Sequence, residues 1–322
     1  MNVGILGCGA FGFALCDILV ENKNKVTMWT YSEDEKDMLV SMRSTPKLPD
    51  YTINNSVFIT DLMDRAVTSM DLVVVAVPAF AFENTIKNMK KYISKSTPVL
   101  IATKGIQQDT CLFLHEIFSK YLSNDFAVIS GPTFAKDIVS GSQVGFSLAT
   151  KKSKTENVIR KCFSNERTKF RRSKDIVGVE ICASVKNVIA IASGMLEGMG
   201  ASDSTRALFL TESLNDVKEL IHALGGKKKT ILSFAGFGDI LMTCTSKTSR
   251  NFSFGYLIGK GATKKEIDVY TDKNTVEGLY TLKSIHKLVR RKKVKMPIIN
   301  LIYDIIDGKK KKEELLKFLI EK

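Results

Sequence analysis

Histidine and cysteine, which build most protein metal centres and all disulfide scaffolds, are scarce in this sequence and poorly placed for either task. The 322 residues include three histidines and six cysteines. The cysteines show no CxxC spacing, and no histidine tract could complete a zinc site. We therefore expect no metal centre, and we interpret all six cysteines as reduced thiols of the core: Cys8, Cys16, Cys111, Cys162, Cys182 and Cys244.

From the sequence we also expect neither a cleavable leader nor a membrane-spanning helix. The first apolar run, residues 3–6, leads directly into a glycine motif and leaves no room for the parts of a signal peptide. The long apolar stretch 177–196 contains Glu180, Lys186 and Asn187, and a lysine at the centre of a membrane helix costs roughly 2.5 to 3.5 kcal/mol. We expect a cytoplasmic protein without a membrane segment, in which this stretch is a buried helix.

Acidic residues are too few to balance the basic ones. The chain has 48 Lys and Arg against 34 Asp and Glu, and the net charge of +14 is concentrated in runs at 227–229, 290–293 and 309–312. Such a field attracts anionic metabolites and nucleic acid alike. Because the runs lack interleaved aromatic residues and no nucleic-acid-binding motif accompanies them, we expect no nucleic-acid partner.

Short apolar runs alternate with amphipathic stretches over the first half of the chain. Most are bounded by Gly, Pro or Ser, and they lie at residues 3–6, 25–29, 72–77, 99–102, 126–129 and 145–149. This alternation is typical of a doubly wound parallel sheet with helices on both faces. Beyond about Val177 the strand signal ends, and helical patterns follow at 177–196, 204–224, 274–288 and 297–306. We predict an α/β protein with a doubly wound domain at 1–177 and an all-helical domain at 178–322.

A glycine-rich turn, Gly7-Cys8-Gly9-Ala10-Phe11-Gly12, follows the first predicted strand and precedes a helix predicted at 13–20. In such a turn, Gly7 permits a tight bend, Gly9 lets a pyrophosphate approach the backbone, and Gly12 lets the helix pack closely on the strand. The amides at the start of the helix then bind the negative charge. The first domain is therefore expected to be Rossmann-like and to bind a dinucleotide.

The end of the second predicted strand bears on the choice of coenzyme. It reads Thr30-Tyr31-Ser32, where NAD-specific folds commonly place a carboxylate for the ribose, and Glu33 and Asp34 arrive late. No carboxylate at this strand end repels a 2'-phosphate, and no arginine there binds one. The sequence permits both NAD(H) and NADP(H).

Other predicted strand ends carry candidate site residues, because ligands gather at the carboxyl ends of parallel strands. One run ends in Thr103-Lys104-Gly105, and we expect Lys104 to project toward the place of a nicotinamide ring. Another ends in Ser130-Gly131-Pro132-Thr133. For Lys104, a solvated surface position is the alternative.

Lys186 lies on a small, apolar face of a predicted helix, with Cys182, Ala183, Ile189 and Ala190 one turn away. A buried ammonium must pair, reach solvent or give up its proton, and in the last case it becomes a useful proton donor and acceptor. The alternative is a structural lysine that caps a buried carbonyl.

Two further segments offer polar groups. Asp239 ends the string Gly236-Phe237-Gly238-Asp239, where it could partner a catalytic lysine or cap a helix beginning at Ile240. The stretch 243–251 is rich in hydroxyls and includes Arg250, whose guanidinium suits phosphate oxygens.

Taken together, these strings resemble the bacterial NAD(P)-dependent sn-glycerol-3-phosphate dehydrogenases. The matching motifs keep the family's order over nearly the whole chain, at 7–12, 102–105, 130–136, 185–190, 236–239, 249–251 and 276–278. The resemblance implies reversible reduction of dihydroxyacetone phosphate to sn-glycerol 3-phosphate, a precursor of phospholipids. We also expect a homodimer.

The resemblance implies roles for individual residues. Lys186 corresponds to the proton donor and acceptor, assisted by Lys104 and Asp239, and these three also contact the substrate. The other implied substrate contacts are Gly131, Thr133, Asn187, Ser249, Arg250 and Asn251. The implied coenzyme contacts are Gly7, Gly9, Ala10, Phe11, Gly12, Tyr31, Lys104, Ala135, Arg250, Thr275 and Glu277.

Some positions depart from the family pattern, and other functions stay open. Residues 182–184 read Cys-Ala-Ser where Gly-Gly-Ala is common, residues 202–204 read Ser-Asp-Ser, and Glu212 stands where an arginine is expected. The alternatives are a related reductase for another small hydroxy or keto acid, such as ketopantoate, and a dinucleotide sensor without turnover. The segment 249–251 together with Asp239 favours the dehydrogenase.

Overall fold

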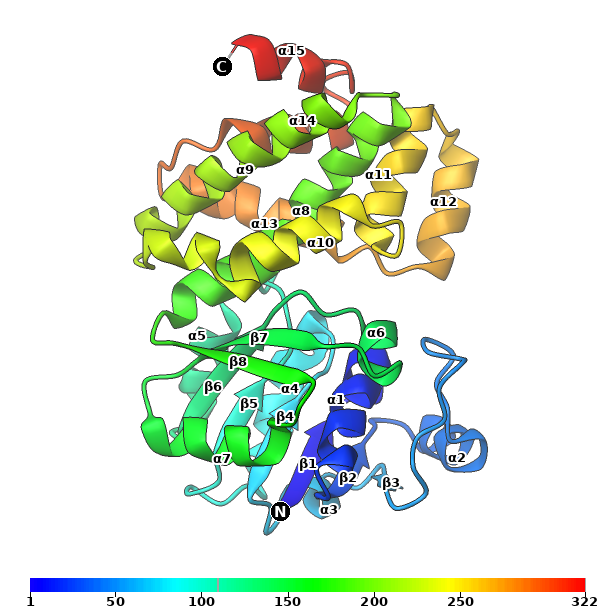
Figure 1. The fold of residues 1–322 in the computed structure, drawn as a ribbon, viewed down its shortest axis with the longest axis vertical. Coiled ribbons are helices and arrows are strands. Elements are labelled where there is room, and N and C mark those ends of the chain that lie inside the picture. Colours follow the sequence, from blue (N-terminus) through cyan, green and yellow to red (C-terminus); the bar gives the residue numbers. More distant parts are fainter. Residues whose placement is uncertain (109, 322) are drawn as a thin grey trace. The chain divides into compact units, whose positions relative to one another are not determined.

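The computed structural model describes residues 1–108 and 110–321, and the chain divides into two compact units (Figure 1). The N-terminal unit, Met1–Lys104 with Phe113–Ile176, holds a sheet and its helices. The C-terminal unit consists of Gly105–Leu112 and the chain from Val177 onward, and its described elements are helices. The α/β class with a helical second part is therefore confirmed. Sequence reasoning had left 105–112 with the first domain.

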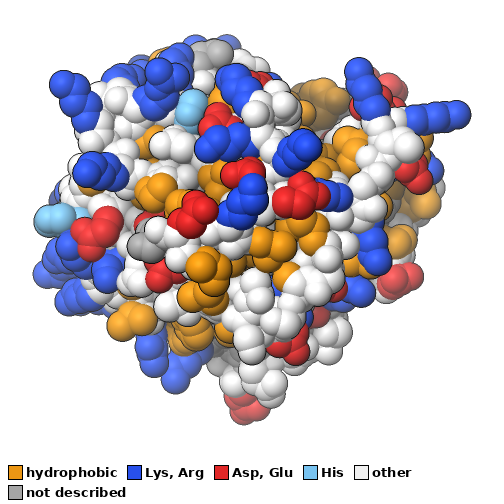
Figure 2. Space-filling view, turned by 90° about the horizontal axis from the view of Figure 1, so that it is seen from above, with side chains coloured by type: hydrophobic (Ala, Val, Ile, Leu, Met, Phe, Trp, Pro, Cys, Tyr) orange, Lys and Arg blue, Asp and Glu red, His pale blue; other side chains and the backbone are white. Residues whose placement is uncertain are grey.

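The interior of both units is apolar, while charged side chains cover the surface. Figure 2 shows one such face, on which many Lys and Arg side chains stand out, with fewer acidic side chains among them. All six cysteines are buried and free, as the sequence predicted. Burial raises the pKa of the Cys162 thiol to about 11, so this thiol is uncharged at neutral pH.

The N-terminal unit is built on an eight-stranded sheet of order β3-β2-β1-β4-β5-β6-β7-β8. The strands are β1 (Asn2–Leu6), β2 (Lys25–Trp29), β3 (Phe58–Thr60), β4 (Leu72–Val75), β5 (Val99–Ile101), β6 (Phe126–Ser130), β7 (Val144–Ala149) and β8 (Thr168–Ser173). The strand order reverses between β1 and β4, where Leu6 pairs with both Trp29 and Val75. A sheet of this kind binds ligands at such a reversal, beyond the carboxyl ends of the strands.

The sheet differs from the expected one in three respects. Strands β6 and β7 pair antiparallel, with Ile129 opposite Leu148, so the sheet is mostly but not wholly parallel. Strands β3 and β8 were not predicted. The run expected at 72–77 ends at Val75, because Pro78 serves as the N-cap of the next helix.

The helices of this unit are α1 (Ala10–Glu21), α2 (Glu33–Met42), α3 (Met63–Val67), α4 (Ala79–Met89), α5 (Leu114–Tyr121), α6 (Ala135–Val139) and α7 (Ser153–Phe163). Helix α1 begins after Gly9 and buries much of its surface, including Phe13, Leu15 and Leu19. It therefore lies against the sheet, and its N-terminus is at the strand reversal.

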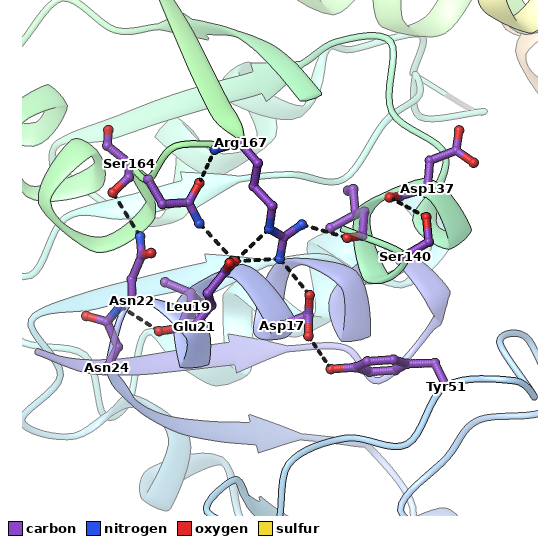
Figure 3. Close-up of polar contacts among 12 residues, drawn as sticks. Asp17, Leu19, Glu21, Asn22, Asn24, Tyr51, Asp137, Ser140, Ser164 and Arg167 are labelled. Carbon is purple, nitrogen blue, oxygen red and sulfur yellow. Dashed lines mark hydrogen bonds and ion pairs between the residues drawn. The ribbon is translucent and has the colours of Figure 1, made fainter. Parts of the chain in front are cut away.

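Arg167, just before β8, links the last part of the N-terminal unit to α1 through hydrogen bonds (Figure 3). Its guanidinium donates to Asp17 Oδ2 at 2.8 Å, to Glu21 Oε2 at 2.7 Å and to the Ile138 carbonyl at 2.6 Å. Tyr51 donates to the other oxygen of Asp17 at 2.7 Å. This network fixes the helix that carries the glycine turn.

The C-terminal unit contains α8 (Ile176–Gly198), α9 (Asp203–Ala223), α10 (Asp239–Thr245), α11 (Arg250–Lys260), α12 (Lys264–Lys273), α13 (Glu277–Arg291), α14 (Pro297–Ile306) and α15 (Glu314–Glu321). A 3-10 helix (Lys228–Leu232) and a π-helical turn (Phe234–Gly238) precede α10. Among the described residues, α8 alone is long and apolar enough to cross a membrane, but 94% of its apolar window is buried. It is the core helix of this unit, as expected.

Helices α8 and α11 pack unusually closely through glycines spaced four residues apart. A Cβ placed on Gly194 would lie 2.0 Å from the Phe252 carbonyl oxygen, and one on Gly255 would lie 1.8 Å from that of Ile191. Gly198 and Gly259 repeat the arrangement one turn on. Because no side chain fits between the backbones, these glycines set the position of α11 relative to α8.

The predicted helices are largely confirmed, with corrections at their ends. The pattern expected at 297–306 coincides with α14, and the one at 204–224 is shifted by one residue from α9. The helix expected from Asn274 begins at Glu277, because Asn274 is the C-cap of α12.

Candidate functional site

The glycine turn of the N-terminal unit has the geometry that a pyrophosphate needs. Gly7 has φ +116°, a conformation that L side chains rarely adopt, and a Cβ there would lie 2.7 Å from the Ala76 carbonyl oxygen. A Cβ on Gly12 would lie 2.1 Å from the Gly7 carbonyl oxygen. At Gly9, no described atom lies within 4 Å of the Cβ position, so the backbone is open to a ligand. The turn therefore fits a dinucleotide, with the first amides of α1 facing its phosphates.

Lys104 lies beside this turn. Its Nζ is 5.1 Å from the centre of the Phe11 ring, within the range of a cation–π contact. Ala10 and Phe11 form the start of α1, so the structure brings three predicted coenzyme residues together. Lys104 is half-buried.

Two exposed aromatic side chains stand near the ends of β2 and β4. Tyr31, a predicted coenzyme residue, and Phe80, in the first turn of α4, are each 82% exposed. Sequence reasoning missed Phe80, although an aromatic residue two positions after Pro78 at a strand end was an available signal. Glu33 and Asp34 lie in the first turn of α2, which Ser32 caps. The carboxylate that the structure places at the end of β2 is that of Glu35, which accepts from the Thr30 hydroxyl.

Packing accounts for part of the residue choice in the segment that follows β6. A Cβ on Gly131 would lie 2.0 Å from the Gly145 carbonyl oxygen on β7, so glycine is required there whatever binds. Thr133 is buried, and its hydroxyl donates to the Gly131 carbonyl at 3.3 Å. Ala135 begins α6.

In the C-terminal unit, Lys186 and Asp239 form a buried ion pair. The Nζ of Lys186 is 2.5 Å from Oδ1 of Asp239, and the two residues are 6% and 0% exposed. The Thr243 hydroxyl lies 3.3 Å from the same oxygen. The sequence left two roles open for Asp239, a partner of the lysine or a helix cap. The structure shows the ion pair, and Gly238 occupies the N-cap position of α10.

The π-helical turn before α10 sets the position of Asp239. Gly236 has the non-helical angles φ −86° and ψ −105°, and a Cβ there would lie 2.2 Å from the Ile231 carbonyl oxygen. The glycine-rich segment before Asp239 therefore packs tightly against the backbone at Ile231. Such π-helical turns are frequent at functional sites.

The remaining predicted residues of this unit surround the start of α11 and of α13. Asn187 donates to Glu277 at 3.3 Å, and Asn251 accepts from the Gly278 amide at 2.8 Å. Ser249 caps α11 by accepting from the amide of Phe252, which leaves Arg250 exposed at its first position.

Thr275 is also exposed, in the connection between α12 and α13. Within residues 1–108 and 110–321, no three His, Cys, Asp or Glu side chains cluster as metal ligands would.

The structure combines a dinucleotide-binding turn at the reversal of a doubly wound sheet with a helical unit that contains a buried Lys–Asp pair. This combination is typical of nicotinamide-dependent oxidoreductases that have a Rossmann-like domain and a helical domain. Comparison with known proteins narrows this class. Residues 2–156 match the N-terminus, and residues 175–317 the C-terminus, of the NAD-dependent glycerol-3-phosphate dehydrogenases.

Full-length relatives agree with that match. The chain is 36% identical over 314 residues to a glycerol-3-phosphate dehydrogenase (NAD(P)+) from Thermoanaerobacter sp., covering 96% of this chain and 94% of the relative. The solved glycerol-3-phosphate dehydrogenase of Coxiella burnetii superposes with a TM-score of 0.93 at 30% identity, covering 100% and 99% of the two chains. The chain therefore belongs to the NAD-dependent glycerol-3-phosphate dehydrogenase family, and the resemblance inferred from its motifs is confirmed.

The alternative reductases share the fold at a greater distance. A ketopantoate reductase from Ralstonia eutropha superposes with a TM-score of 0.62 at 13% identity, covering 98% of this chain and 100% of that one. Similarity at this level concerns the architecture alone.

Proposed function

We propose that this protein catalyses the reversible reduction of dihydroxyacetone phosphate to sn-glycerol 3-phosphate with NADH or NADPH. The observation that carries the proposal is the buried Lys186–Asp239 pair in a chain of this family. A reductase of a ketone needs a positioned acid for the developing alkoxide, and Lys186 is an ammonium held in a protected place.

The N-terminal unit is proposed to hold the coenzyme, which supplies the hydride when bound. Gly7, Gly9 and Gly12 shape the pyrophosphate site, and their geometry supports this role. Tyr31 and Phe80 offer aromatic faces for stacking at the strand ends, as exposed rings at such positions can. Ser32 is engaged as a helix cap, and the Glu35 carboxylate at the end of β2 is engaged by the Thr30 hydroxyl, so the site is proposed to tolerate a 2'-phosphate.

Lys186 is proposed to donate the proton. As the carbonyl carbon accepts hydride, the oxygen takes the proton from the Lys186 ammonium, and the neutral amine regains one from solvent. Asp239 holds the ammonium in position until then, because a buried cation without a counter-charge is costly. Lys104 is proposed to assist at the substrate oxygens.

Arg250 is proposed as the main phosphate ligand, because it is exposed at the start of α11, where a guanidinium and the free helix amides both favour an anion. Ser249, Asn251 and Asn187 support it through the capping and linking hydrogen bonds described above. Gly131 and Thr133 stay predicted substrate contacts, and Ala135, Thr275 and Glu277 predicted coenzyme contacts.

We further propose that the enzyme acts in the cytoplasm, as a homodimer, and supplies the glycerol phosphate of phospholipids. The buried position of α8, the one described helix with the length and apolarity of a membrane span, supports the first of these statements.

The test is to replace Lys186 by Met, which keeps the stem of the side chain and removes the acid. We expect kcat to fall at least about a thousandfold, because general acid catalysis and electrostatic stabilisation are lost together. Coenzyme affinity, measured by nicotinamide fluorescence on the same preparation, should change by less than about tenfold, because most of the proposed coenzyme contacts belong to the other unit.

Two controls make this test decisive. Lys264→Met, at an exposed lysine of α12, should turn over normally. The double variant Lys186→Met/Asp239→Asn leaves no buried charge, so it should fold and bind coenzyme yet stay inactive. Near wild-type turnover of either Lys186 variant would show that this lysine is structural, and Lys104 would become the leading candidate.

A further inference from the structure

Most of the protein's net charge lies in one stretch near its C-terminus. Residues 283–312 include eleven Lys or Arg and two Asp, which accounts for nine of the fourteen net positive charges. This stretch covers the second half of α13, all of α14 and the connection that follows. None of the residues assigned above to coenzyme, substrate or proton transfer lies in it.

The spacing of the basic residues on α13 places them on one face. Lys283, Lys287 and Arg290 follow each other at intervals of four and three residues, and all three are exposed. The opposite face, with Leu282, Ile285 and Leu288, is buried. Like charges at these spacings repel one another, so an anion bound among them would relieve the repulsion. His286, half-buried, lies between them on the same face.

This face borders a groove of ≈ 520 Å³ between α13 and α14. On the α14 side the groove is lined by Tyr303 and Asp304, followed by Lys309. The His286 and Tyr303 rings stack with centroids 3.8 Å apart and planes 9° apart, and Lys309 Nζ is 5.5 Å from the Tyr303 centroid. The volume suits a small ligand, and the stacked rings give the groove a rigid wall.

The charges around the groove are strongly unequal. Its described lining contains four Lys or Arg side chains and one carboxylate, Asp304. Nearby, Asp307 is engaged by Lys309 at 2.6 Å, and Asp304 lies 4.0 Å from Lys310 outside the groove. The local field therefore favours an anion of more than one charge, and Arg290 can bind a phosphate through two parallel hydrogen bonds.

We propose that the groove between α13 and α14 is a second anion site, which binds a phosphate-bearing ligand away from the proposed catalytic residues. The ligand carries a phosphate group attached to a polar or cyclic group. Its source is either a soluble metabolite or the headgroup of an anionic phospholipid. The site is independent of the proposed function, because its residues take no part in that reaction.

His286 provides a built-in reporter of occupancy. Burial lowers the pKa of its imidazole, Arg290 and Lys309 lower it further, and Asp304 and Asp307 oppose them. A bound anion stabilises the imidazolium and so raises this pKa. By linkage, the affinity for the anion should increase as the pH falls through the pKa of His286. The chain has only three histidines, so its ring signal can be assigned by NMR.

The experiment titrates the whole protein with pyrophosphate, by calorimetry and by the His286 ring signal, and separately with vesicles of phosphatidylglycerol or phosphatidylcholine. The test variant is Lys283→Gln/Arg290→Gln, and the matched control is Lys264→Gln/Lys265→Gln, which removes two exposed charges on α12. We expect the test variant to lose at least about tenfold in affinity, because two charge-assisted contacts disappear. The control should lose less than about twofold, since only the long-range field changes.

The outcomes separate the two ligand sources. Saturable pyrophosphate binding that raises the pKa of His286 and fails in the test variant supports a soluble ligand. Binding confined to phosphatidylglycerol vesicles, with the same loss, supports a lipid headgroup. The proposal is overturned if neither probe binds, if the His286 signal does not respond, or if the test variant loses no more affinity than the control, as binding at the glycine turn alone would give. Dehydrogenase activity of both variants, measured in parallel, reports on folding and on the proposed function separately.

Discussion

At the residue scale, Lys186 and Asp239 link the proposed chemistry to the stability of the helical unit. Each is the counter-charge of the other in a region with almost no solvent. Removing one member of such a pair typically costs about 3 to 5 kcal/mol, because the remaining charge has no partner, whereas removing both is far less harmful. This asymmetry can be measured with single and double variants of the pair.

The first prediction concerns Asp239→Asn. We expect this change to lower the free energy of unfolding by about 3 kcal/mol or more, and to lower kcat as the ammonium loses its orientation. The double variant with Lys186→Met should recover most of the stability and none of the activity. Urea unfolding of the four proteins in the cycle measures the coupling. A double variant as unstable as the sum of the single variants would contradict the account.

The second prediction concerns Arg250→Lys, which keeps the charge and loses the planar fork. We expect KM for dihydroxyacetone phosphate to rise severalfold or more, while free dihydroxyacetone, which has no phosphate, stays an equally poor substrate for both proteins. Arg291→Lys, at an exposed arginine ending α13, is the matched control and should leave KM unchanged. If KM for dihydroxyacetone phosphate is also unchanged in Arg250→Lys, the phosphate binds elsewhere.

Single residues differed in how well the sequence could predict them. Lys186 and Asp239 could be predicted as candidates, because a charged group in an apolar or glycine-rich pattern has few structural explanations. Their pairing spans 53 positions, and no local pattern encodes such a distance. Gly131 was predicted as a substrate contact, and the structure adds a packing reason that only the neighbouring strand β7 reveals.

At the scale of elements, the close packing of α8 and α11 holds the site of the helical unit together. Helix α8 carries Lys186 and Asn187, and α11 begins with Arg250 and Asn251. The glycines at their contact let the backbones approach to a distance that excludes any side chain. The proposed proton donor and the proposed phosphate ligand are thus placed relative to each other by glycines that have no proposed role in the reaction.

The third prediction follows from this contact. In an ordinary helix interior, Gly→Ala gains roughly 1 kcal/mol from helix propensity, but at Gly255 the new Cβ would collide with the Ile191 carbonyl, and overpacking costs about 1 to 3 kcal/mol or more. We expect Gly255→Ala to lower Tm and to reduce kcat/KM as α11 shifts. Lys260→Ala, at an exposed position of the same helix, should leave Tm close to that of the wild type. A Tm above the wild-type value for Gly255→Ala would rule out the tight contact.

Elements could be predicted where one face is buried and could not where burial is partial. Strand β8 escaped prediction because Lys169, Arg171 and Arg172 interrupt its buried side chains at the edge of the sheet. Strand β3 has three residues, too few for a pattern. Helix α12 has no buried residue and therefore no apolar stripe. The antiparallel pairing of β6 and β7 depends on the path of the chain, which periodicity does not report.

At the scale of the whole molecule, the sequence already indicated a coenzyme-binding part followed by a helical part, because each has its own period of apolar residues. It did not indicate that residues 105–112 belong to the second part, after which the chain returns to the first. The positive charge that was visible in the composition is concentrated on α13 and in the connections before and after α14, beside the groove that the structure forms.

The central claim is that the whole protein is an NAD(P)H-dependent reductase of dihydroxyacetone phosphate. The most direct measurement follows NADH and NADPH oxidation by the purified protein with dihydroxyacetone phosphate, dihydroxyacetone and ketopantoate in turn. We predict turnover of dihydroxyacetone phosphate with both coenzymes, whose kcat/KM values differ by less than about a thousandfold, or roughly 4 kcal/mol. Dihydroxyacetone and ketopantoate should be poor substrates by comparison. The account would be contradicted if dihydroxyacetone phosphate were not reduced with either coenzyme, or if ketopantoate were reduced faster.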